Sequence, residues 1–377
     1  MRKPIRVLQC FGIMGRGGAE TLIMNIYRNI DREKIQFDFV VHREKNAAYD
    51  EEIFDLGGNI HRVPKYNLSN HFKYKKAWHN LFKNHGTWPI IHGHMFTTAA
   101  IYLKIAKKYG LTTIAHSHNT STGVGFSAII KNLLQYPIKY NADLYFACSK
   151  AAGLWLFGEK ICKKDTFFIL NNAIDTKKFV YDEEIRIKKR TELSVEDNFV
   201  IGHIGSFMTQ KNHKFLIELF DKVHSKNNNT LLLLIGDGGL RLAIEDKVKN
   251  LGLTNNVIFT GSRSDIPELL QAMDVFVFPS LYEGLGIVAV EAQTAGLHCV
   301  VSDSVPKEAY ITELIEKASL RDSADVWVDK ILKYANGYER IDTSIQIKAK
   351  GYDIAETAKW LEEFYLKEHE KLSTNHH

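Results

Sequence analysis

The sequence predicts an α/β protein that contains two doubly wound parallel sheets. Apolar runs of strand length alternate with segments of helical periodicity, as where Ile5–Phe11 is followed by Ala19–Asn29. This alternation stops over a charged segment and restarts at Phe199–Ile204. The length of 377 residues suits about two domains. Strands separated by helices form βαβ units, so both sheets are expected to be parallel.

The domain boundaries follow from the same pattern. Residues 1–175 form the first expected domain, 176–198 a charged linker, 199–349 the second domain, and 350–377 a helix that packs back towards the first domain. The expected strands are Ile5–Phe11, Phe37–Val41, Ile90–His92, Thr112–Ala115, Leu144–Cys148, Phe167–Leu170, Phe199–Ile204, Leu231–Ile235, Val257–Phe259, Val275–Phe278 and Cys299–Ser302. The expected helices are Ala19–Asn29, Tyr49–Leu56, Thr98–Tyr109, His213–His224, Leu240–Leu251, Ile266–Ala272, Ile287–Ala295 and Ile354–His369.

Composition excludes several classes of protein. Hydrophobic residues make up 45% and charged residues 25%, as in ordinary globular proteins. No apolar run approaches the ~18–20 residues that cross a bilayer, and Arg6 and Gln9 interrupt the N-terminal run, which argues against a signal peptide. The four cysteines lie far apart without CxxC spacing, so we expect reduced thiols in a cytoplasmic protein.

Charge is distributed unevenly along the chain. Residues 1–175 carry 24 Lys/Arg and 13 Asp/Glu, whereas the remainder carries 25 and 31, which together give the net charge of +5. A basic half attracts phosphorylated substrates or an anionic membrane surface; without a nucleic-acid-binding motif, we expect no nucleic-acid partner. Two aromatic and basic segments, 72–83 and 129–140, could lie in a membrane interface, and the first could equally be an ordinary helix packed on a sheet.

Four loops at expected strand ends could carry chemistry, because ligands of doubly wound sheets bind at the carboxyl ends of strands. The glycine-rich loop 15–20 is either a tight turn or a phosphate site. The histidines of His92-Gly93-His94 and of residues 116–120 suit hydrogen bonds to sugar hydroxyls, a structural role or, less well, zinc, since no carboxylate or thiol accompanies them.

The other two loops are in the second half. Lys211 precedes a helix N-terminus, which suits a diphosphate, although a surface lysine would look the same. Glu283 and Glu291 are eight residues apart, the first in a glycine-bearing turn and the second about two turns into the following helix. One could contact a sugar while the other reaches a ribose.

Together and in this order, these motifs resemble the large retaining glycosyltransferase family 4, which has the GT-B fold. The Glu-x7-Glu element, Gly17-Gly18-Ala19-Glu20, His116-Ser117-His118-Asn119, Asn171–Asp175 and Gln210-Lys211-Asn212 carry the resemblance, and bacterial capsule and exopolysaccharide transferases look most similar. The resemblance implies two Rossmann-like domains that face each other across a cleft, with the nucleotide-sugar donor in the C-terminal domain and the acceptor in the N-terminal one.

The resemblance also implies roles for residues. The catalytic residues would be Glu283 on the transferred sugar, Lys211 on the leaving diphosphate and His118 on the sugar. Donor-binding residues would be Gly17, Gly18, Ser206, Gly236, Asp237, Ser262, Arg263, Gly284, Leu285, Gly286 and Glu291, the last on the ribose. Acceptor-binding residues would be His94, His116, Asn119 and Thr120. The family needs no metal, so we expect no metal site and no cofactor beyond a UDP-sugar co-substrate.

Ser206 departs from the family pattern, which usually has an arginine there. Losing one of two cations on a diphosphate removes leaving-group stabilisation. Three interpretations stay open: Arg16, Arg263 or Lys214 compensates, the enzyme is slow, or the chain is a partner subunit that binds donor and hardly catalyses.

The expected function is retaining transfer of a hexose or N-acetylhexosamine from a UDP-sugar to a lipid-linked or oligosaccharide acceptor in capsule or exopolysaccharide biosynthesis. The alternatives are a partner-dependent nucleotide-sugar-binding subunit, paired with another glycosyltransferase, and a nucleotide-sugar 2-epimerase. The expected location is cytoplasmic and peripheral on the inner face of the plasma membrane.

Overall fold

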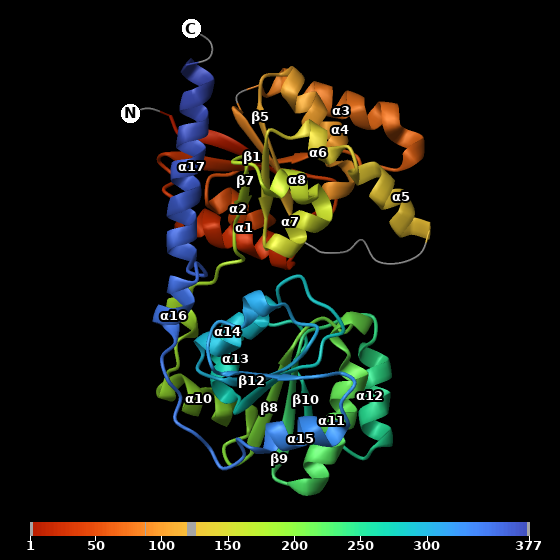
Figure 1. The fold of residues 1–377 in the computed structure, drawn as a ribbon, viewed down its shortest axis with the longest axis vertical. Coiled ribbons are helices and arrows are strands. Elements are labelled where there is room, and N and C mark those ends of the chain that lie inside the picture. The colour runs from red at the N-terminus through yellow and green to blue at the C-terminus, as the bar shows by residue number, and fades with distance from the viewer. Residues whose placement is uncertain (1–2, 87, 119–125, 375–377) are drawn as a thin grey trace. The chain divides into compact units, whose positions relative to one another are not determined.

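The computed structural model describes residues 3–86, 88–118 and 126–374, and it divides into two compact units (Figure 1). The first unit comprises Met1–Ile174 and Asp353–His377, and the second comprises Asp175–Tyr352. Each unit contains one parallel sheet with helices packed on it. The predicted class, α/β with two doubly wound parallel sheets, is therefore confirmed.

The sheet of the first unit has, within the described residues, seven strands in the order β3-β2-β1-β4-β5-β6-β7. Its strands are β1 (Ile5–Phe11), β2 (Ile35–Val41), β3 (Ile60–Arg62), β4 (Ile90–Gly93), β5 (Thr112–Ser117), β6 (Leu144–Ala147) and β7 (Phe167–Ile169). The central strand β1 pairs with β2 on one side and with β4 on the other, both in parallel. The strand order thus reverses between β1 and β4, and the loops that leave them diverge at the carboxyl edge.

Two hydrophobic clusters cover the faces of this sheet. One contains side chains from α1 and α17, and the other contains side chains from α3 and α4. The helices are α1 (Gly18–Asn29), α2 (Asp50–Asp55), α3 (His71–Asn84), α4 (Phe96–Lys108), α5 (Phe126–Gln135), α6 (Ile138–Asn141), α7 (Lys150–Phe157), α8 (Glu159–Cys162) and α17 (Ile354–Thr374). The sheet is therefore buried on both faces, as parallel sheets require.

Helix α17 is last in the sequence but belongs to the core of the first unit, where it packs against α1 and β2 (Figure 1). The chain enters it through a parallel bridge in which the amide of Ile354 donates to the carbonyl of Ile174 at 2.9 Å. Glu362 on α17 accepts hydrogen bonds from the Asp31 amide and the Lys34 ammonium, both at 3.0 Å. The expected return of a C-terminal helix to the first domain is confirmed.

The sheet of the second unit has, among the described residues, six parallel strands in the order β10-β9-β8-β11-β12-β13. They are β8 (Phe199–Ile204), β9 (Thr230–Ile235), β10 (Val257–Phe259), β11 (Val275–Phe278), β12 (His298–Ser302) and β13 (Ile315–Ala318). The helices are α9 (Thr176–Phe179), α10 (Glu183–Leu193), α11 (His213–Lys226), α12 (Arg241–Asn250), α13 (Ile266–Ala272), α14 (Ile287–Thr294), α15 (Ala324–Leu332) and α16 (Ser344–Ala349). Here the order reverses between β8 and β11.

The segment expected as a linker, residues 176–198, instead forms α9 and α10 and packs within the second unit. Arg186 and Arg190 on α10 both donate to the carboxylate of Asp274, at 2.5 and 3.1 Å. Arg190 also donates to the carbonyls of Ala272 and Val195. The charges that suggested a solvated linker therefore hold this helix to the sheet.

Sequence reasoning also missed the short strands β3 and β13, which have three and four residues. Both lie at sheet edges, where one side of a strand is left unpaired. A strand this short shows too little alternation to be recognised from its pattern.

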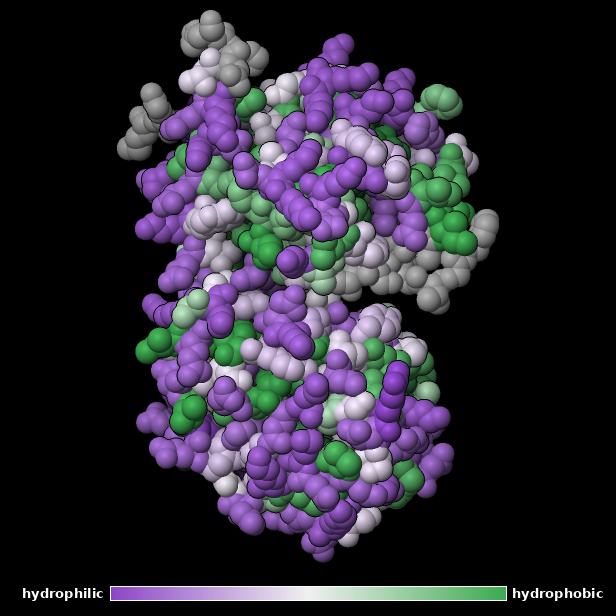
Figure 2. Space-filling view, in the orientation of Figure 1, coloured by the Kyte–Doolittle hydropathy of each residue, from purple (hydrophilic) through white to green (hydrophobic). Residues whose placement is uncertain are grey.

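The two aromatic and basic segments differ in burial. On α3, Tyr74, Trp78 and Phe82 lie in the core, so the interpretation of this segment as an ordinary packed helix is the correct one. On α5, Ile129 and Leu133 are 57% and 70% exposed, and Figure 2 shows apolar side chains gathered there. No helix among the described residues has the length and apolar character needed to cross a membrane.

Candidate functional site

At the carboxyl edge of the second sheet, the loop after β8 is hydrogen-bonded to the loop after β11. The amide of Leu281 donates to the carbonyl of Gln210 at 2.8 Å, and the Gln210 side chain donates to the carbonyl of Tyr282 at 3.0 Å. Asn212, in the left-handed conformation at the start of α11, donates to the carbonyl of Pro279 at 3.2 Å. These bonds hold Lys211 and Glu283 at a fixed separation.

Lys211 and Glu283 form an ion pair, with 2.7 Å between Nζ and Oε1. Their side chains are 17% and 7% exposed, and the ammonium lies 4.7 Å from the centre of the Phe278 ring. Limited contact with water strengthens this attraction. A Cβ atom on Gly205 would lie 3.0 Å from two carbons of the lysine stem, so a larger residue there would displace the ammonium.

Glycines bring the loops after β8 and β9 into backbone contact. A Cβ atom on Gly236, whose φ is +136°, would lie 2.2 Å from the carbonyl oxygen of Gly205. One on Gly238 would lie 2.7 Å from the carbonyl oxygen of Phe207. The amide of Gly236 in turn donates to the carbonyl of Gly261 at 2.9 Å, which ties in the loop after β10 that carries Ser262 and Arg263.

Three cations were expected to replace the positive charge that is missing at Ser206, and one of them, Arg263, already has an ionic partner. It donates two hydrogen bonds to Asp265, at 2.7 and 2.6 Å, and it lowers the pKa of that carboxyl. Arg16 and Lys214 are exposed, and no described residue forms an ion pair with either. Ser206 is itself exposed, so a larger side chain has room there.

Glu291 is the fifth residue of α14, so it lies one turn into the helix rather than the expected two. Its carboxylate is partly buried, and the described residues give it no hydrogen bond or ion pair. Burial raises the pKa of Glu291 to about 7. In the preceding turn, Gly286 has a φ of +81°, and the side chain of Leu285 is buried, so only backbone groups of Leu285 can face a ligand.

In the first unit, the two glycines expected to admit a diphosphate differ in the space that is open beside them. A Cβ atom on Gly17, the N-cap of α1, would lie 2.4 Å from Oε2 of Glu20, so the carboxyl group of Glu20 fills that space. A Cβ atom on Gly18 would have nothing within 4 Å. Burial raises the pKa of Glu20. The open approach is therefore at Gly18.

Four histidines gather at the carboxyl ends of β4 and β5. His94 Nδ1 lies 2.8 Å from His118 Nε2, and His92 Nε2 lies 3.2 Å from His116 Nδ1. Burial lowers the pKa of His118 to about 3 and places the pKa values of the other three well below the ordinary value. All four imidazoles are thus neutral at physiological pH.

The positions of His92, His94 and His116 would allow a shared metal ion. Their hydrogen bonds disfavour it: both ring nitrogens of His92 and of His94 already have protein partners. Among the described residues, only His116 Nε2 and His118 Nδ1 in this cluster lack one. The cluster therefore suits hydrogen bonding to a ligand better than metal ligation. Asn119 and Thr120 lie outside the described residues.

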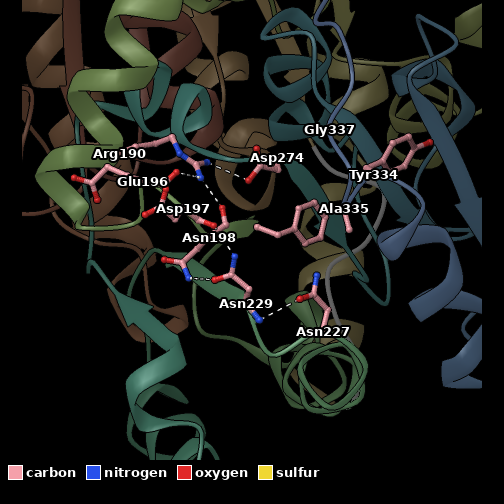
Figure 3. A pocket seen from close by; sticks show the side chains of 11 residues that line it. Arg190, Glu196, Asp197, Asn198, Asn227, Asn229, Asp274, Tyr334, Ala335 and Gly337 are labelled. Atoms are coloured by element: carbon pink, nitrogen blue, oxygen red, sulfur yellow. Dashed lines mark hydrogen bonds and ion pairs between the residues drawn. The ribbon is translucent and has the colours of Figure 1, made fainter.

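A cavity of about 200 Å³ lies at the opposite, amino-terminal ends of β8, β9 and β11 (Figure 3). Figure 3 shows Arg190 directed towards Asp274 and Asn198, and Asn229 bonded to Asn198 and Asn227. These polar groups satisfy one another, so the cavity is part of the anchorage of α10.

Comparison with known proteins identifies the family. The model for "Glycosyltransferase Family 4" matches residues 16–178, and the model for "Glycosyl transferases group 1" matches residues 184–346. The putative glycosyltransferase EpsF of Bacillus subtilis is 37% identical over 338 residues, which cover 88% of each chain. This chain belongs to the group 1, family 4 glycosyltransferases.

Two further comparisons concern a characterised activity and the fold. An Escherichia coli UDP-Gal:α-D-GlcNAc-diphosphoundecaprenol α-1,3-galactosyltransferase is 27% identical over 228 residues, which cover 57% of this chain and 58% of that one. The structure of Anabaena HepE in complex with UDP-glucose has a TM-score of 0.72 and 18% identity, over 98% of this glycosyltransferase and 99% of HepE. The fold of this glycosyltransferase is GT-B.

The structure groups the residues that the sequence had singled out into two sets. In the second unit of this glycosyltransferase, the loops after β8, β9, β10 and β11 carry Ser206, Lys211, Gly236, Asp237, Ser262, Arg263 and Glu283–Gly286, with Glu291 on α14. In the first unit, Gly17 and Gly18 follow β1. His92 and His116 lie near the ends of β4 and β5, and His94 and His118 directly follow these strands. Sequence reasoning missed Gln9 and Tyr365, which contact the histidines. No local motif marks either residue.

The stability of the free glycosyltransferase should fall as pH rises, through Glu291. Its folded pKa of about 7 exceeds the ordinary value, so between about pH 4.5 and 7 the folded state keeps a proton that the unfolded state has already lost, and stability falls across that range. Above pH 7 the ionised, unpaired carboxylate costs up to about 3 kcal/mol. Glu291→Gln should therefore melt at a higher temperature than the native protein at pH 8, and at nearly the same temperature at pH 4.5.

The exposed Glu313 of the same unit provides a matched control. Thermal melts of Glu313→Gln should differ from the native protein by the same amount at both pH values. If the difference in melting temperature between Glu291→Gln and the native protein does not grow between pH 4.5 and 8, the raised pKa of Glu291 is contradicted.

Proposed function

We propose that this glycosyltransferase transfers a hexose or N-acetylhexosamine, with retention of anomeric configuration, from a UDP-sugar to a lipid-linked or oligosaccharide acceptor during capsule or exopolysaccharide assembly. The observation that carries the proposal is the shielded Lys211–Glu283 pair at the carboxyl edge of the second sheet. The E. coli relative supports it, since that enzyme uses UDP-galactose and a diphosphoundecaprenol-linked acceptor.

In this proposal, binding of the donor separates the Lys211–Glu283 ion pair, and each of the two side chains then contacts the donor instead. Lys211 Nζ turns from Glu283 to the diphosphate, and Glu283 accepts hydrogen bonds from hydroxyls of the transferred sugar. The loops that carry both groups are already joined by hydrogen bonds, so only the two side chains need to move. The positive end of α11, a helix of 14 residues, adds to the stabilisation of the leaving phosphate.

The remaining donor contacts follow from the position of each loop. The carboxylate of Glu291, which has no partner among the described residues, accepts hydrogen bonds from the ribose hydroxyls. Backbone amides of Gly284, Leu285 and Gly286 contact the sugar and phosphate. The loops with Gly236–Asp237 and Ser262–Arg263, joined by a backbone hydrogen bond, border the base and the phosphates. In the first unit, Gly17 and Gly18 approach the diphosphate, the more open position being Gly18.

The chemistry proposed needs no metal, because Lys211 and the helix dipole take up the negative charge that develops on UDP. As the glycosidic bond to UDP breaks, positive charge builds on the anomeric carbon. The carboxylate of Glu283 is engaged with sugar hydroxyls, so we propose that the acceptor hydroxyl attacks from the face that UDP leaves, and that the departing phosphate takes its proton. His118 contacts the transferred sugar, and His94, His116, Asn119 and Thr120 are proposed on the acceptor side.

A second candidate function is a donor-binding subunit that needs a partner glycosyltransferase. Ser206 favours it, because the usual arginine is absent and Arg263 is bound to Asp265. We favour compensation by Arg16 or Lys214, both exposed and without a described ionic partner. Lys214 lies in the first turn of α11, three residues beyond Lys211.

We further propose that the exposed apolar surface around α5 docks on an anionic membrane, where a lipid-linked acceptor would be found. Ile129, Leu133, Tyr136 and Tyr140 are each more than half exposed. Lys139 lies 3.6 Å from the ring centre of Tyr136, so a cation sits among the aromatic groups. Apolar side chains flanked by lysines suit an interface with acidic lipid head groups.

Loss of either member of the ion pair should abolish most turnover. Thermal stabilisation across UDP-, GDP-, ADP- and TDP-sugars first identifies the donor, since a ligand at 100 times its Kd adds about 2.7 kcal/mol. With that donor, Lys211→Ala should lower hydrolysis or transfer by about 10²–10³-fold, the cost of one preorganised charge partner. Glu283→Gln should also lose most activity.

Lys222→Ala, which removes an exposed lysine from α11, the helix that follows Lys211, should keep near-native turnover. Near-native transfer by Lys211→Ala or by Glu283→Gln would overturn the site assignment. Failure of every UDP-sugar to stabilise the protein would count against the proposed donor.

Ser206→Arg should change turnover by less than about 10-fold, because another cation already compensates. Lys214→Ala or Arg16→Ala should then lower turnover, by up to about 10². Steady-state rates with the identified donor measure both effects. A 10²-fold gain for Ser206→Arg, with no loss for Lys214→Ala and Arg16→Ala, would instead favour the slow or partner-dependent enzyme.

The protein should float with vesicles that contain anionic lipid and stay in the soluble fraction with neutral vesicles. Leu133→Ser together with Tyr136→Ser should reduce flotation several-fold. Phe72→Ser is the matched control, because Phe72 is 84% exposed on α3 and lies outside the α5 surface. Equal recovery in the soluble fraction with both kinds of vesicle would contradict membrane docking.

A further inference from the structure

The histidine cluster is connected to the C-terminal helix through Tyr365. The Tyr365 hydroxyl oxygen accepts a hydrogen bond from Gln9 Nε2 at 3.2 Å and lies 2.7 Å from His92 Nδ1. Its ring is fully buried, in edge contact with Phe37 and His92. Tyr365 thus starts two chains of hydrogen bonds that end at different histidines.

The first chain fixes the protons of His94 and His118. Because Gln9 Nε2 donates to Tyr365, Gln9 Oε1 is the atom that faces His94, and it accepts from His94 Nε2–H at 2.9 Å. A neutral His94 then has a bare Nδ1, which must accept from His118 Nε2–H at 2.8 Å. His118 Nδ1 is left as an acceptor with no partner among the described residues.

The second chain runs in the opposite sense and ends in a donor. The Tyr365 hydroxyl, which already accepts from Gln9, gives its own proton to His92 Nδ1. His92 Nε2–H then donates to His116 Nδ1 at 3.2 Å. A neutral His116 carries its proton on Nε2, a buried atom that has no described partner.

The two chains therefore end in an acceptor and a donor on adjacent rings. The ring centroids of His116 and His118 are 3.9 Å apart. A sugar hydroxyl is both a donor and an acceptor, so it can satisfy the two atoms at once. The burial that keeps all four rings neutral also keeps these proton positions fixed, because no ring carries a second proton.

We infer that Tyr365, Gln9 and His94 are positioning residues that hold His118 in its Nε2–H tautomer, so that His118 Nδ1 accepts from a sugar hydroxyl to which His116 Nε2–H donates. The inference rests on the proposed role of His118 at the transferred sugar. Without Tyr365, Gln9 has no fixed orientation, and His118 can adopt the tautomer that presents N–H where an acceptor is needed.

The test is Tyr365→Phe, which keeps the buried ring and removes the hydroxyl. Nitrogen-15 NMR of histidine-labelled full-length protein reports which ring nitrogen carries the proton, and His118→Asn identifies the His118 signals. We expect the Nε2–H tautomer in the native protein and a mixture in Tyr365→Phe. We also expect kcat to fall about 3- to 10-fold, the cost of one misdirected hydrogen bond, with unchanged stabilisation by UDP.

Tyr27→Phe is the matched control, because Tyr27 is also fully buried in the first unit and its hydroxyl donates to the side-chain oxygen of Gln36. It should leave the His118 tautomer and kcat unchanged. Gln9→Leu, a second variant that does not depend on the folding of Tyr365→Phe, should shift the His118 tautomer in the same way.

An Nδ1–H tautomer of His118 in the native protein, or an unchanged tautomer in both variants, would overturn the inference, whatever the activity. A shifted tautomer with native kcat would overturn the functional part alone. Native turnover by His118→Asn would show that the proposed role of His118 at the sugar is wrong. This outcome is distinguishable from failure of the inference, because the tautomer is measured on the free protein.

Discussion

All strands in both sheets are parallel, and the rest of the structure depends on this constraint. Parallel strands bring all their outgoing loops to one edge, where the backbone groups of those loops need partners. In the second unit the loops satisfy one another: Gly205 bonds to Ile235, Gly236 to Gly261, and Leu281 to Gln210. The polar side chains of the candidate site are therefore carried by loops whose backbones are hydrogen-bonded to one another.

This arrangement explains why the charges at the site differ in character. Lys211 and Glu283 come from two bonded loops and neutralise each other at 2.7 Å, so the free site holds both charges at little cost. Glu291 lies on α14, and its carboxylate has no partner among the described residues. In the free protein, then, one carboxylate is already paired with a cation, whereas the other gains its partners only from a ligand.

The longer strands, many of the helices and the grouping of the motifs by loop were predictable from the sequence, because these features depend on local patterns. Features set by side-chain contacts were not predictable. Arg263 is bound to Asp265, two residues further along the chain. Asp274, more than 80 residues away, holds α10, and Tyr365 contacts Gln9 from the far end of the sequence. Segments 72–83 and 129–140 look alike in composition, yet most large apolar side chains are buried in the first and exposed in the second, since burial depends on what packs against a helix.

The position of α17 also sets the order in which this protein can be completed during synthesis. The second unit, Asp175–Tyr352, is contiguous and can fold as soon as it leaves the ribosome. The first unit cannot complete its core at that stage, because Ala358, Leu361 and Tyr365 are translated only after the second unit. During that interval the face of the first sheet that α17 covers is exposed on the nascent chain.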